Sequence, residues 1–225
     1  MKLTKKELIK AITPGLESLG YVWFKDSISG FQGLYIKDVG SGLYMTLGLT
    51  ISRYENEFTG DFYYSTTTNI GCVWGDIPLE CYKRPGFLMT DEELSPYRDE
   101  GSLKKDIWWD GSDVNSVGDF IRIVKMVEPR LINNKILKEE ILKSVSVNLL
   151  NSQSEKVRNI VSSIPNAAYR FTPEKPIDGI PLDWFKASEC VLVKEDAFIN
   201  KYAVKRLASD AYRQHVMQEY RNQLL

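Results

Sequence analysis

The chain contains one histidine, His215, and only three cysteines among its 225 residues. Histidine is the side chain whose usual pKa lies nearest neutrality, and both residue types are leading nucleophiles, bases and metal ligands. So small a supply disfavours hydrolytic and metal chemistry and favours a protein that works by binding. We therefore expect no cofactor and no metal site. An odd number of cysteines without a CxxC pair predicts no disulfide framework, which suits a reducing cytoplasm.

Several other features are also missing. The formal net charge is -1, so no global basic field attracts nucleic acid or an anionic membrane. No apolar run approaches the roughly 20 residues that cross a bilayer, and charges interrupt the N-terminal segment where a signal peptide would be apolar. The phosphate-loop, dinucleotide and nucleophile-elbow motifs are absent. A calcium loop beginning at Asp110 fails at its fifth position, where Val114 lacks a side-chain oxygen.

The first 130 residues predict a helix followed by an antiparallel sheet. Residues 4–19 have helical apolar spacing, with Thr4 and Glu7 at the spacing of a capping box, and Pro14 predicts a kink or two short helices. Strands rich in aromatic and β-branched residues are predicted over 21–25, 31–37, 43–54 and 58–74. Alternation over residues 43–51 predicts one buried and one more polar face.

The rest of the chain reads as a long irregular segment and then helices. Residues 75–115 carry loop signals, and loops of such length are often functional. Helices are predicted over 116–126, ended by Pro129, and over 136–150, 154–163 and 196–223. The predicted fold class is α+β: an N-terminal helix, an aromatic-rich antiparallel sheet and a mainly helical C-terminal part. We divide the chain into an α+β domain, 1–130, and a helical extension packed on it, 131–225.

The possible catalytic side chains favour structural roles. His215 lies in a polar helical stretch, and Cys72 and Cys190 lie in strand-like or apolar runs typical of small buried side chains. Cys81 stands near Lys83 and Arg84, whose charges would lower the pKa of a thiol, so it is the one thiol worth testing. Carboxylate catalysis stays open, because acidic residues are plentiful and sequence spacing does not reveal their separation.

Negative charge and tryptophan are concentrated between residues 91 and 119. Nine acidic residues against three basic ones give this segment a charge of -6, while residues from Lys201 onward carry +3. Tryptophan is enriched at interface hot spots, and carboxylates around it would steer a basic partner. The candidate partner-binding residues are Glu92, Glu93, Asp106, Trp108, Trp109 and Asp110. The alternative is that both tryptophans plug the open face of the sheet while the acids are solvated.

Two short sequences carry a resemblance to a known family: LGYVWF over residues 19–24 and YMTLGL over 44–49. With the preceding amphipathic helix, they resemble the DUF4304-like bacterial family of unknown function over about residues 4–130. The helical remainder departs from that pattern. The resemblance implies no catalytic residues. It does imply an immunity role, since proteins of this style lie beside toxin genes.

Our leading hypothesis is a non-enzymatic, cytoplasmic immunity protein. It would bind a cognate toxin, plausibly a basic nuclease, and occlude its active surface. No nucleic-acid or membrane partner is expected, and the oligomeric state stays open. The alternatives are a carboxylate-based enzyme, a small-ligand-binding module on the aromatic sheet, and a scaffold that dimerises through its helical tail.

Overall fold

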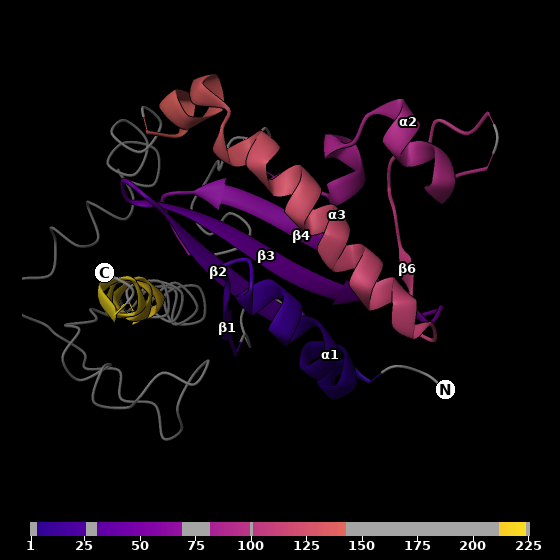
Figure 1. Ribbon diagram of the computed structural model, residues 1–225, viewed down its shortest axis with the longest axis horizontal. Coiled ribbons are helices and arrows are strands. Elements are labelled where there is room, and N and C mark those ends of the chain that lie inside the picture. The colour runs from indigo at the N-terminus through magenta and orange to yellow at the C-terminus, as the bar shows by residue number, and fades with distance from the viewer. Residues whose placement is uncertain (1–3, 26–30, 69–81, 100, 143–211, 224–225) are drawn as a thin grey trace, which may run out of the picture.

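The computed structural model describes residues 4–25, 31–68, 82–99, 101–142 and 212–223. Their centre is a six-stranded antiparallel sheet in the order β1-β2-β3-β4-β5, with β6 also paired to β4. The helices α1 and α3 lie across one face of this sheet (Figure 1), where they enclose the main hydrophobic core. The α+β prediction is confirmed.

Helix α1 (Lys5–Glu17) begins at the predicted capping box. The Glu7 amide donates to Thr4 Oγ1 at 3.3 Å, and the Thr4 amide donates to Glu7 Oε2 at 2.9 Å. Leu8, Ile12 and Leu16 are fully buried against the sheet. The alternative of two short helices is wrong, since Pro14 falls in the last turn of one helix, where the missing N–H removes only one helical bond.

Four of the five strand pairings join strands that are consecutive in the chain, and the fifth joins β4 to β6. The strands are β1 (Val22–Phe24), β2 (Gly33–Gly40), β3 (Leu43–Ile51), β4 (Glu57–Ser65), β5 (Tyr82–Lys83) and β6 (Trp109–Asp110). Residues 40–42 turn β2 into β3 with positive φ at all three positions, and two of the three are glycine. The fourth predicted strand, 58–74, is confirmed to Ser65, and residues 69–81 lie outside the described part.

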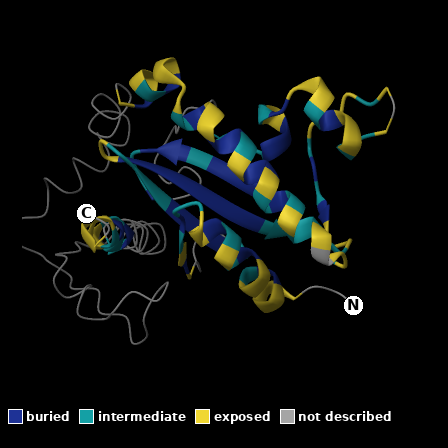
Figure 2. Cartoon of the chain, viewed as in Figure 1, coloured by how far each residue is buried: buried dark blue, intermediate teal, exposed yellow. Residues whose placement is uncertain are grey.

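Strand β3 is buried on both faces, so the predicted polar face is wrong. Every residue from Leu43 to Leu49 is buried (Figure 2). On the face opposite α1 and α3, Tyr44 belongs to a second apolar cluster. The other buried members of that cluster are Phe24, Leu34, Ile36 and Met217. Met217 lies in a helical stretch, 212–223, so the end of the chain helps cover a face that alternation alone assigns to solvent.

Helix α3 (Val114–Ile132) is longer than predicted at both ends. Asp113 caps it by accepting a 2.9 Å hydrogen bond from the Asn115 amide. The predicted interruption at Pro129 is wrong, because this proline again lies in the last turn and its own carbonyl accepts from the Asn133 amide at 2.9 Å. Its core side chains are Phe120, Ile123, Val124 and Val127.

The predicted irregular segment contains short ordered elements. Besides β5 and β6 it holds η2 (Pro85–Leu88), α2 (Asp91–Leu94) and η3 (Ser95–Tyr97). Gly86 lets two parts of the segment pass closely, since a Cβ at this position would lie 2.0 Å from the Lys105 carbonyl oxygen. The segment thus runs along the outer edge of β4, which pairs with β5 near one end and with β6 near the other.

Described residues beyond 130 also contribute side chains to the two hydrophobic clusters. Leu137 and Ile141, within helical residues 135–142, pack in the main cluster. The predicted helix 154–163, most of 136–150 and the start of the final helix lie outside the described residues, so the proposed domain division stays a prediction. Among the described helices, none is long and apolar enough to cross a membrane.

Candidate functional site

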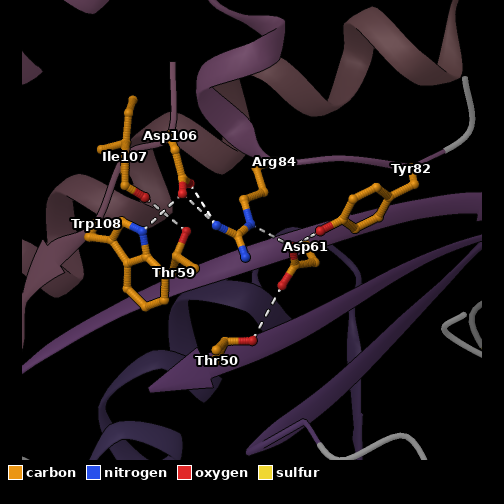
Figure 3. Close-up of polar contacts among 8 residues, drawn as sticks. All are labelled: Thr50, Thr59, Asp61, Tyr82, Arg84, Asp106, Ile107 and Trp108. Atoms are coloured by element: carbon orange, nitrogen blue, oxygen red, sulfur yellow. Dashed lines mark hydrogen bonds and ion pairs between the residues drawn. The ribbon is translucent and has the colours of Figure 1, made fainter. Parts of the chain in front are cut away.

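Asp61 is a buried carboxylate at the centre of β4, and three donors surround it. Its Oδ1 accepts from the Tyr82 hydroxyl at 2.5 Å and from Arg84 Nε at 2.9 Å, and its Oδ2 accepts from the Thr50 hydroxyl at 3.3 Å (Figure 3). Burying a carboxylate is costly unless it is paired and hydrogen-bonded. Asp61 therefore anchors the start of the 82–110 segment to the sheet.

Arg84 links Asp61 of β4 to Asp106, in the second half of the 82–110 segment. Its Nη1 donates to both oxygens of Asp106, at 2.8 and 2.6 Å, and its guanidinium carbon lies 5.3 Å from the centre of the Trp108 ring (Figure 3). Trp108 Nε1 also donates to Asp106, at 3.2 Å. We call Asp61, Arg84, Asp106 and Trp108 the arginine clamp, because one cation joins β4 to the chain that leads into β6.

The ionisation of the clamp suits cohesion and recognition. Burial raises the pKa of Tyr82 to about 12, and the hydrogen bond to Asp61 adds to the rise. Burial by itself would lower the pKa of Arg84, but its bonds to Asp106 and Asp61 outweigh burial and raise it. Near neutral pH the phenol stays neutral and the guanidinium stays charged, so both groups can donate the hydrogen bonds that hold the clamp together. A pocket of about 390 Å³ adjoins the clamp, lined by Tyr82, Lys83, Arg84, Phe87 and Asp106.

A second cluster is centred on Asp119 of α3. Its Oδ2 accepts from the Tyr97 hydroxyl at 2.7 Å and from Trp109 Nε1 at 2.9 Å, while Arg122 binds Oδ1 at 2.6 Å. Burial would raise the pKa of Asp119, but these hydrogen bonds together hold it below its usual range. Burial and the bond to Asp119 raise the pKa of Tyr97 to about 12. A pocket of about 460 Å³ lies beside this cluster and includes Glu93 in its lining.

The two adjacent tryptophans occupy different environments. Trp109 is only 3% exposed. Its ring packs edge-on against Phe120, with ring centres 5.0 Å apart, and stacks on Phe58, with ring centres 6.2 Å apart. Trp108 is half-buried on the arginine clamp. Trp109 thus acts as a core plug, as the alternative interpretation predicts, and the folded chain leaves it almost no surface for a partner.

The structure separates the predicted acidic residues. Glu93 of α2 receives two hydrogen bonds from Arg130 of α3, at 2.7 and 2.6 Å, and these bonds are the main reason that its pKa falls to about 2. Glu92 is exposed beside it, whereas Asp110 is exposed in β6. Figure 1 shows α2 at the upper right and β6 below it, so Glu92 and Glu93 lie on a different part of the backbone from Asp110.

Asp110 instead lies with acidic residues of the β3–β4 hairpin. It faces Glu57 in the β4–β6 register, and the Gly111 amide donates to the Asn56 carbonyl at 2.6 Å. Burial, a side-chain hydrogen bond with Glu55 and the charges of Glu55 and Asp110 raise the pKa of Glu57, while Lys104 opposes the rise. Asp113 follows at the start of α3, and Tyr54 at the hairpin tip is 95% exposed. The acidic end is defined by Tyr54, Glu55, Glu57, Asp110 and Asp113.

The remaining candidate side chains lie at the periphery or outside the described chain. His215 is exposed, and its Nε2 lies 3.5 Å from Glu219 one helical turn away. All three cysteines fall in segments that the structure does not describe. Within the described ranges, no group of three histidine, cysteine or acidic side chains is placed to hold a metal ion.

Sequence reasoning missed the groups that organise the site: Asp61, Arg84, Arg122 and Arg130. The charge sum over residues 91–119 omits the arginines that bind its acidic residues, because all three lie outside that range. Arg84 and Arg130 are distant in sequence, and Arg122 lies three residues beyond Asp119. One signal was present, because Asp61 is the only acidic residue within the predicted strand 58–74. A charged residue at such a position needs a partner, although its identity depends on the fold.

Comparisons with protein-family models, curated proteins and solved structures found no match to this chain. The resemblance to the DUF4304-like family therefore stays a prediction. Function has to be argued from the site itself.

Proposed function

We propose that this chain is a non-enzymatic recognition protein that binds a basic protein partner at its acidic end. The observation that carries the proposal is the grouping of four carboxylates at the end of the sheet where the hairpin exposes Tyr54. Tyrosine combines a large apolar ring with a polar tip and loses few rotatable bonds on binding, so an exposed one is well suited to a contact hot spot. The surrounding carboxylates would orient a cationic partner and raise its association rate.

The other acidic residues are less suited to this role because arginines already bind them. Asp106, Glu93 and Asp119 each form an ion pair of 2.6 Å within the chain. A partner would have to replace those contacts before gaining any of its own. The carboxylates of the acidic end form no ion pair within 4 Å among the described residues, although Lys104 offsets part of their charge. Their field is therefore available to a partner.

The specific form that we propose is a bacterial immunity protein acting in the cytoplasm. Such a protein neutralises a toxin by occluding its active surface, and a nuclease toxin presents a basic surface because it binds phosphates. The acidic end offers charge complementary to that surface. This form of the proposal agrees with the family resemblance and with the scarcity of histidine and cysteine.

The carboxylate-enzyme alternative gains no specific observation. Such an enzyme needs a carboxyl group with a raised pKa in a cleft that admits a substrate. Two described carboxyl groups have raised pKa values, Glu57 and Glu128. Glu128 is buried against Lys37 at 2.6 Å, and neither carboxyl group lines either pocket beside the clusters.

The test compares two matched double variants of the full chain. Tyr54→Ala with Asp110→Lys removes an exposed ring and reverses a charge at the acidic end. Phe87→Ala with Glu92→Lys makes the same two changes outside the acidic end. The gene for each variant is co-expressed in a bacterial host with a toxin-like gene that neighbours it in its native genome, and survival of the host is scored. The affinity of each purified variant for the toxin is measured by calorimetry. We expect the first variant to lose protection and about a hundredfold in affinity, the scale of one hot spot plus one charge reversal.

The control variant should protect as the wild type does. If the control loses protection while the acidic-end variant retains it, the docking surface lies toward α2. If the wild-type protein binds no toxin-like neighbour and no basic protein captured from its own host, the proposed function is wrong.

A further inference from the structure

The pocket beside the arginine clamp has a lining that the proposed function does not use. Its volume of about 390 Å³ lies within the range of small-molecule sites. It lies between the chain that leaves β5 and the chain that enters β6, and none of its lining residues belongs to the acidic end. A pocket of this size needs both apolar walls and a few polar groups to select a ligand.

The polar groups of the lining are a donor and an acceptor side by side. Arg84 uses Nε for Asp61 and Nη1 for Asp106, which leaves the two N–H groups of Nη2 without a partner among the described residues. Asp106 accepts three hydrogen bonds, while an ionised carboxylate has about four acceptor positions, and its side chain is 34% exposed. Arg84 and Lys83 together balance the charges of Asp106 and Asp61, so this edge has no net charge and suits a ligand that is polar and uncharged.

The walls of the pocket are aromatic. Phe87 is 54% exposed in a chain whose large apolar side chains are mostly buried. Tyr82 forms the second aromatic wall. Its hydrogen bond to Asp61 and its contact with Tyr63, whose ring centre lies 4.7 Å away, hold it in place. Aromatic faces favour flat ligands, because every nucleobase has a π-face that can stack on an aromatic ring.

We propose that this pocket binds a small planar heterocycle that presents a hydrogen-bond donor beside an acceptor, the chemistry of a nucleobase. Arginine donates to the guanine O6 and aspartate accepts from ring or exocyclic N–H groups, so the Arg84–Asp106 pair matches such an edge. Phe87 would supply the stacking surface. This inference is independent of the proposed function, since it uses neither Tyr54 nor the carboxylates of the acidic end.

The experiment titrates the purified full chain with guanosine, cytidine and 1-methylguanosine, using calorimetry and ligand-observed NMR. The methylated base keeps the ring but lacks the N1–H donor. We expect saturable binding of guanosine or cytidine, with guanosine at least tenfold tighter than its methylated form. Phe87→Ala should weaken binding about tenfold, and Asp106→Asn should remove the preference for guanosine over 1-methylguanosine.

Trp23→Ala is the matched control, because it removes a partly exposed ring outside both the pocket and the acidic end and should leave the nucleoside affinities unchanged. Binding that is equal for wild type and Phe87→Ala overturns the proposal, as does equal affinity for guanosine and 1-methylguanosine or the absence of saturable binding. If Asp106→Asn loosens the clamp and fails to fold, Phe87→Ala and the methylated base still decide the question.

Discussion

Two groups of acidic residues in this chain have opposite roles. Asp106, Glu93 and Asp119 are tied to arginines and hold the 82–110 segment to β4 and α3. The carboxylates of the acidic end, Asp110 among them, lie at the end of the sheet whose hairpin carries the exposed Tyr54. Asp110 and Asp113 come from the same stretch, residues 91–119, as the first group, and only their neighbours in space separate them from it.

The charge sum of a stretch of sequence does not show where a binding surface lies. The -6 of residues 91–119 is halved by Arg84, Arg122 and Arg130. Charges that are satisfied inside the fold contribute cohesion, while charges that remain exposed contribute an external field. Removing a member of the first group should therefore cost stability, and removing a member of the second should cost affinity.

The largest effect on stability should come from Trp109, which the first group holds through Asp119. Trp109→Ala leaves a core cavity and removes the Nε1 donor, so we expect a loss of about 4 kcal/mol in the free energy of unfolding. Urea denaturation followed by circular dichroism measures it. Trp108→Ala is the matched change and should cost about 1 kcal/mol, the scale of one exposed cation–π contact. Equal costs would contradict the division between the two tryptophans.

Arg84→Met should have the next largest effect. It leaves the buried Asp61 without its cation, and breaking such a pair typically costs 3–5 kcal/mol. Because Arg84 is partly exposed, we expect about 3 kcal/mol in the same assay. Arg53→Met, an exposed arginine on the hairpin of the acidic end, should change stability by less than about 0.5 kcal/mol. A loss below about 1 kcal/mol for Arg84→Met would show that the clamp is not a stabilising contact.

The Glu93–Arg130 pair should make stability depend on acid pH. Folding lowers the pKa of Glu93 to about 2, so the pair stabilises the fold fully above about pH 4.5, and this stabilisation disappears as the pH falls toward 2. Glu93→Gln should lower the melting temperature at pH 7 and match the wild type near pH 2. Thermal melts across this range measure the difference. Glu92→Gln, with no described ion pair, should follow the wild type at each pH, and a constant gap for Glu93→Gln would refute the linkage.

The smallest effect should come from the acidic end. Folding raises the pKa of Glu57 through burial and the charges of Glu55 and Asp110, so its ionisation above about pH 4.5 destabilises the fold. Asp110→Asn should lower the pKa of Glu57 and add less than about 0.5 kcal/mol of stability at pH 7. NMR titration of Glu57 measures the shift. A loss of stability would place Asp110 in the first group.

Much of the fold was predictable because its signals are local. The capping box at Thr4, the helical spacing of Leu8, Ile12 and Leu16, and the aromatic strands each depend on neighbours in sequence. Pro14 and Pro129 were misjudged, because a proline in the last helical turn removes one bond without ending the helix. The buried second face of β3 was also missed, since its cover includes Met217, far along the chain.

The sequence by itself determined an α+β chain with little histidine or cysteine, and a segment rich in acid and tryptophan. Composition and periodicity are properties of the chain alone, so they could be read without a structure. Only the tertiary structure decided which acids remain exposed, that Trp109 is core and Trp108 is not, and that Asp61 and Asp106 meet at Arg84. Such outcomes depend on contacts between residues distant in sequence, because pairing and burial are set by the packing of the sheet against its neighbours.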